Sequence, residues 1–263
     1  MSDLVSEIEK SFFDKPITDL TIDYMDIGLD MITNSKIIEN IPVVKTFVDM
    51  VKTGMSIKDK FLAKKLMIFA AQIYNGDIPD EEIEKRRKAI INQEKWVKKE
   101  VEEIIVFLDK FDFSYKALMM GKLYVSFVNG IISSDKYLNM LAIIDKWQKY
   151  DSDTLETIYK AYKNKTLNIA NGERDYVVLI DNASKQRLES LGILNIKREV
   201  INLLKKFDDF LDNEDMEEII ENGEYTLEET YGLNYEGIIL AEILNEGKVI
   251  TKFDEEYFNL TSI

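Results

Sequence analysis

Residues Ile57–Tyr74 read IKDKFLAKKLMIFAAQIY and carry the most apolar helical pattern of the chain. Their second half, Leu66–Ala71, is apolar on every side, which is typical of a helix surrounded by other helices. Their first half is amphipathic, with apolar side chains at helical spacing and lysines on the other side. The apolar set is Ile57, Phe61 and Leu62, and the lysines are Lys58, Lys60, Lys64 and Lys65. We therefore expect a central helix whose apolar side faces a bundle core.

Further helical patterns lie on both sides of this stretch. Before it, helices are expected over residues 3–13, about 18–33 and 41–52. After it, helices are expected over 80–91, 92–108, 115–128, 134–147 and from 152 or 153 to about 163. The turns between them are short and contain pairs such as Asn129–Gly130, which favour helix ends. Residues 41–163 are thus predicted to form an antiparallel helical array.

The pattern changes after Lys165. Tyr176–Ile180 is a β-branched run between turn residues and predicts a strand, and Tyr225–Leu227 predicts a second, shorter one. Helices are expected over 182–191, 196–211 and 237–244. The predicted fold class is therefore mainly α, with a helical array over residues 1–163 and a small α/β region over residues 164–263.

Part of this second region resembles winged-helix domains. Arg187–Leu194 has the form of a helix end leading to a strand, and Tyr231–Leu244 has the form of a strand leading to a final helix. The resemblance covers roughly residues 153–244 and implies a winged-helix-like fold. The segment at the position of the wing has about 30 residues, whereas the wing of such domains is short. The region is also acidic, so we expect it to contact a protein rather than to recognise DNA.

The middle of the chain resembles a second group of proteins. Ile41–Phe47 and Lys52–Lys60 are similar to the opening of a family of uncharacterised bacterial and phage-borne helical proteins. In that family a helical array precedes a winged-helix-like end. The resemblance implies an origin in a phage or mobile element, and it implies no particular activity.

Two residue types are missing from the chain, which contains no histidine and no cysteine. Without them there is no serine–histidine or cysteine–histidine triad, no zinc finger and no two-histidine iron site. The sequence also offers no phosphate-binding glycine loop beside a positioned arginine cluster. We therefore expect a non-enzymatic protein without a cofactor or a bound metal.

Acidic residues gather towards the end of the chain, whose net charge is −15. Residues 51–100 carry a net charge of +4, whereas residues 201–263 hold 17 acids and 4 bases. Such a surface repels nucleic acids and anionic membranes and attracts basic protein surfaces. The residues predicted to bind such a partner are Asp208, Asp209, Asp212, Glu214, Asp215, Glu217, Glu218 and Glu221. Solubility alone is the simpler interpretation of the same charge.

Two basic stretches are interpreted structurally. The run Lys85–Lys88 is expected to form the solvated end of a helix. The lysines of Ile57–Tyr74 could contact a membrane surface. The second half of this stretch has no polar face, however, so burial of the helix in a bundle is favoured. The N-terminus has no signal-peptide pattern and no apolar run is long enough to span a membrane, so a cytoplasmic location is expected.

The leading functional hypothesis is an acidic protein-interaction module. It would bind a basic surface of a host protein, for example a protein of a host defence system, and in this way block it. The first alternative is a transcription regulator that uses the winged-helix-like region. The second is a carboxylate–metal enzyme acting on phosphates, with acid pairs such as Glu217–Glu218 as ligands. Self-association as a homo-oligomer is compatible with all three.

Overall fold

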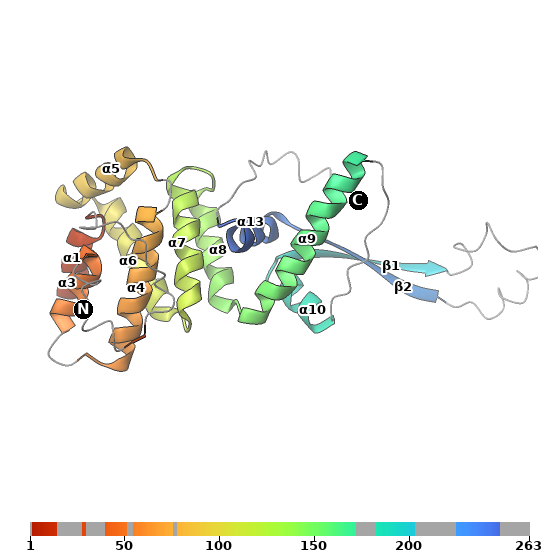
Figure 1. Ribbon diagram of the computed structural model, residues 1–263, viewed down its shortest axis with the longest axis horizontal. Helices are drawn as coiled ribbons and strands as arrows, with labels where there is room; N and C mark the ends of the chain where they lie inside the picture. Colours follow the sequence, from red (N-terminus) through yellow and green to blue (C-terminus); the bar gives the residue numbers. More distant parts are fainter. Residues whose placement is uncertain are drawn as a thin grey trace, which may run out of the picture. The chain divides into compact units, whose positions relative to one another are not determined.

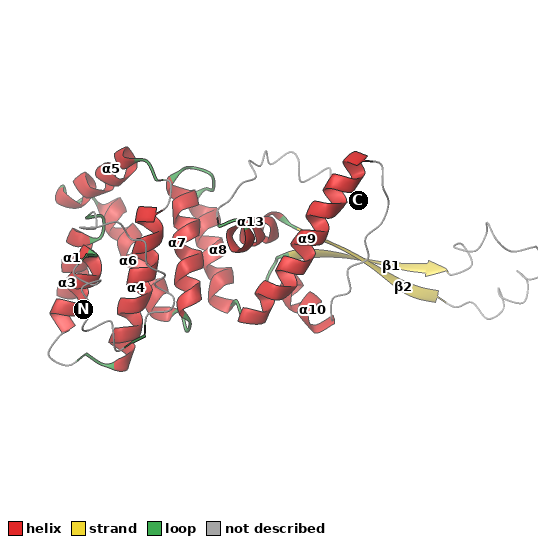
Figure 2. Ribbon diagram, in the orientation of Figure 1, coloured by secondary structure: helices red, strands yellow, loops and turns green. Residues whose placement is uncertain are grey.

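The structure is a computed structural model of the 263-residue chain. It describes residues 2–14, 28–29, 40–51, 55–75, 78–171, 182–202 and 225–247. Within these residues it contains ten helices and one two-stranded sheet (Figures 1 and 2). The predicted class, mainly α with a small sheet, is therefore confirmed.

The helices of the first 150 residues are α1 (Ser2–Ser11), α3 (Pro42–Val51), α4 (Ile57–Asn75), α5 (Asp80–Ile91), α6 (Lys95–Lys110), α7 (Ser114–Val128) and α8 (Ser134–Lys146). They are followed by α9 (Lys149–Asn171), α10 (Asn182–Ser190), β1 (Leu194–Asn202), β2 (Tyr225–Leu233) and α13 (Tyr235–Asn245). The chain divides into two compact units. One comprises Met1–Gln148 with Glu242–Phe253, and the other comprises Lys149–Ala241 with Asp254–Ile263.

Helix α4 lies in the core of the first unit, where it packs against α3, α6 and α7. Its apolar stretch Leu66–Ala71 is buried on all sides, as predicted. The approach of α7 depends on Gly121, because a Cβ there would lie 2.6 Å from Cβ of Gln72. A side chain at position 121 would force the two helices apart.

The first two turns of α4 differ from the prediction. Ile57 and Phe61, expected to face the core, are 71% and 41% exposed, whereas Lys65, expected on the solvent side, is 4% exposed. The ammonium group of Lys65 donates hydrogen bonds to the carbonyl oxygens of Phe111 (2.7 Å) and Asp109 (3.3 Å). These carbonyls at the end of α6 have no partner within their own helix, and the lysine satisfies them. Lys65 therefore faces inward.

The helix ends follow local sequence rules. The hydroxyl of Ser133 accepts a hydrogen bond from the backbone N–H of Lys136 and caps α8. Gly130 has a φ of +71° just after α7, and its N–H donates to the carbonyl of Phe127. The turn predicted at Asn129–Gly130 is therefore confirmed. Helix α8 ends at Lys146, one residue before the predicted end, and Trp147 is buried.

The second unit contains the sheet, in which β1 and β2 pair antiparallel from Leu194↔Leu233 to Asn202↔Tyr225. The strand predicted at Tyr225–Leu227 is confirmed and is longer than expected. The helix predicted over residues 196–211 is wrong where the structure describes it, because residues 196–202 form β1. In the backbone register of the pair, Val200 stands opposite Leu227.

Two polar contacts hold helices of the second unit. The side-chain oxygen of Asn234 accepts the N–H of Gly237 at 2.9 Å and caps α13. Arg187 of α10 donates to the buried carboxylate of Asp151 on α9 at 2.8 Å. Helix α9 begins before and ends after the range predicted for it.

Several sequence predictions lie outside the described residues, namely most of the helix over 18–33, the strand Tyr176–Ile180 and residues 203–211. None of the described helices combines the length and the apolar character that crossing a membrane requires.

Candidate functional site

All residues predicted to bind a basic partner lie outside the described part of the chain. They are Asp208, Asp209, Asp212, Glu214, Asp215, Glu217, Glu218 and Glu221. Their role stays a prediction. In the described part, no three or more acidic, histidine or cysteine side chains come together in a way that could hold a metal ion.

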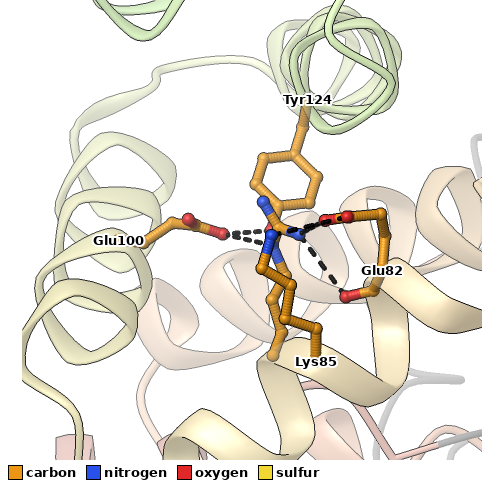
Figure 3. Close-up of polar contacts among 5 residues, drawn as sticks. Glu82, Lys85, Glu100 and Tyr124 are labelled. Carbon is orange, nitrogen blue, oxygen red and sulfur yellow. Dashed lines mark hydrogen bonds and ion pairs between the residues drawn. The ribbon is translucent and has the colours of Figure 1, made fainter.

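The most concentrated group of polar side chains surrounds the guanidinium of Arg86 on α5 (Figure 3). Its Nε donates to Oε1 of Glu100 on α6 at 2.9 Å and to the hydroxyl of Tyr124 on α7 at 3.1 Å. Its Nη1 donates to Oε2 of Glu82, one turn earlier on α5, at 2.8 Å. The hydroxyl of Tyr124 donates in turn to Glu100. Figure 3 shows Glu82, Glu100 and Tyr124 converging from three helices.

Electrostatics keep Arg86 and Tyr124 each in one protonation state. Burial alone would lower the pKa of Arg86, but Tyr124, Glu100 and Glu82 outweigh it and raise that pKa. Burial, reinforced by the nearby Glu100 carboxylate, raises the pKa of Tyr124 well above its ordinary value. The guanidinium therefore stays charged and the tyrosine stays neutral over the physiological range of pH.

The Arg86 group is suited to holding three helices in place. Arg86 is 5% exposed, so the prediction that the whole run Lys85–Lys88 is a solvated helix end is wrong at this position. A buried guanidinium requires carboxylate or hydroxyl partners, and here they come from α5, α6 and α7. The ring of Trp96 lies 5.8 Å from the guanidinium carbon and covers it further.

Tyr137 on α8 lies next to this group. Its ring packs edge-on against that of Tyr124, with 6.0 Å between centroids. Among the described side chains, its hydroxyl is a buried polar atom without a hydrogen-bond partner. Burial raises the pKa of Tyr137 well above its ordinary value, and Glu100 and Glu103 add to the effect. The hydroxyl therefore stays protonated.

A second candidate lies on the surface of the first unit, where α4 begins and α6 ends. Four large apolar side chains are exposed there, and we call them the apolar end surface: Ile57, Phe61, Val106 and Phe113, with exposed fractions of 71%, 41%, 63% and 56%. Large apolar side chains that gather on one part of a surface mark interaction sites more often than scattered ones do.

Polar contacts connect the start of α4 to the end of α6. Lys58 lies 3.0 Å from the carboxylate of Asp109, and Lys65 reaches the carbonyl of Phe111. Phe61 precedes Lys65 by one helical turn and therefore lies on the same side of α4. Ile57 lies one turn further out.

The other two members come from the last two turns of α6 and from the residues that follow it. Val106 precedes Asp109 by three residues and shares its helix face. Phe113 follows Phe111 by two residues, and its ring stacks on that of Tyr115 with 5.7 Å between centroids. Stacking holds the Phe113 ring in place while more than half of it stays in contact with solvent.

The apolar end surface is flanked by basic side chains. Residues 57–65 and 106–116 together hold six lysines and three aspartates, in a chain whose net charge is −15. Lys65 and Lys116 are buried, while Lys58, Lys60, Lys64 and Lys110 lie at least partly in solvent. Lys58 pairs with Asp109 and Lys110 pairs with Asp145, so carboxylates lie among the exposed lysines.

Sequence reasoning missed this surface because it assigned Ile57 and Phe61 to the core. One signal was available: a short helical stretch that alternates lysines with two large apolar residues also fits a surface helix that binds a partner. Phe113 stands in a loop between Asp112 and Ser114, where no helical face requires an apolar residue. The exposure of Phe113 and Phe61 depends on how the helices pack, which a local window of sequence does not show.

Comparison with known proteins adds no identification: no protein family model, no curated protein and no solved structure matches this chain.

Proposed function

We propose that this chain is a non-enzymatic protein-interaction module and that it binds its partner through the apolar end surface. The observation that carries the proposal is the exposure of Phe61 and Phe113, two large aromatic side chains in segments that also expose Ile57 and Val106. Exposed aromatic side chains held in place by their neighbours are typical anchors of protein interfaces, because they bury a large area and lose little conformational freedom.

Composition supports the same function. The chain lacks histidine and cysteine, the side chains that most often act as general bases and thiolate nucleophiles. The polar group around Arg86 connects helices and gives the module a rigid scaffold, which lowers the entropic cost of binding.

Affinity capture tests the proposal. The purified protein and its Phe61→Ser, Phe113→Ser double variant are used as baits in a lysate of the cells that express the protein, at low and at high salt. We expect the wild-type protein to recover a partner that the double variant loses. The matched control is Ile91→Ser, which removes an apolar side chain that is 77% exposed at the last residue of α5. Equal recovery by all three baits would contradict the proposal.

The interaction predicted for the acidic residues between Asp208 and Glu221 is a second candidate, favoured by the net charge of residues 201–263. A host partner, a phage or mobile-element origin and an anti-defence role rest on the family resemblance and stay predictions. Transcription regulation and carboxylate–metal chemistry on phosphates also stay predictions. A mobility shift with DNA and a metal-dependent rise in melting temperature are the measurements that would favour them.

A further inference from the structure

We draw no further inference here: the strongest candidate, the pair of outer backbone edges of the two-stranded sheet formed by β1 and β2, carries none because nothing in the described part of the chain shows what would pair with those edges.

Discussion

Arg86 and Glu100 form an ion pair inside the first unit, with 2.9 Å between Nε and Oε1 and side chains that are 7% and 14% exposed. The pair connects α5 to α6. The hydroxyl of Tyr124 contacts both residues and extends the connection to α7. Removal of one partner of a buried ion pair strongly destabilises the folded protein, because the other charge is then buried without a partner.

Replacement of Arg86 by methionine should therefore lower the free energy of unfolding by about 3–5 kcal/mol. The double variant Arg86→Met with Glu100→Leu should lose less than the sum of the two single variants, because neither charge then remains buried alone. Urea denaturation at neutral pH measures all three variants. Additive losses would show that the two side chains do not interact.

Tyr124 and Tyr137 provide a matched pair of buried hydroxyls. Tyr124→Phe removes a donor to Glu100 and an acceptor for Arg86, and it should cost about 1–3 kcal/mol. Tyr137→Phe removes a hydroxyl without a partner and should leave stability unchanged or raise it slightly. Thermal melting compares the two variants. A large loss on Tyr137→Phe would mean that its hydroxyl has a partner, such as a buried water molecule.

Gly121 permits the close approach of α4 and α7. Alanine is the better helix former, yet its Cβ would lie 2.6 Å and 2.7 Å from Cβ and Cγ of Gln72. Gly121→Ala should therefore destabilise the protein by about 1–3 kcal/mol. Gly232→Ala on β2, where a Cβ would meet no atom within 4 Å, is the control and should change stability by less than about 0.5 kcal/mol. Stabilisation by Gly121→Ala would contradict the packing described here.

Glu9 on α1 predicts a pH dependence. Burial raises the pKa of its carboxyl, partly offset by Lys98 and reinforced by Glu102. Because the pKa of Glu9 is raised in the folded state, its ionised form destabilises the folded protein at pH values above that pKa. Below the pKa of the unfolded state, the carboxyl is protonated in both states and does not affect stability. Glu9→Gln should therefore raise the melting temperature at neutral pH and leave it nearly unchanged at about pH 3.

The control for Glu9 is Glu81→Gln in the exposed first turn of α5. It should lower stability slightly at neutral pH, because a carboxylate near a helix N-terminus is favourable. Stabilisation of equal size by both variants would point to net charge rather than to the burial of Glu9.

The sequence predicted the helices well where their apolar period was long, as in α5, whose bounds match the prediction. The predictions were wrong where contacts with distant parts of the chain outweigh the local pattern of apolar residues. Lys65 is buried because it satisfies carbonyls at the end of α6, and residues 196–202 form a strand because β2 offers a partner almost 30 positions later. Neither partner is visible in a local window of sequence.

The candidate site was harder to predict. The helical period around Ile57 and Phe61 is equally compatible with a core face and a binding face, since both are apolar. The choice depends on which side of α4 is covered by α6 and α7. Arg86 was missed for the same reason, because its carboxylate and hydroxyl partners lie 14 and 38 positions away in the chain.

The most direct measurement places a photo-crosslinking phenylalanine analogue at position 61 and, in a second protein, at the more exposed position 91. Both proteins are irradiated in the cells that express them. If the protein binds its partner through the apolar end surface, we expect a crosslink from position 61 and none from position 91. Crosslinking from position 91 alone, or from neither position, would contradict binding through the apolar end surface.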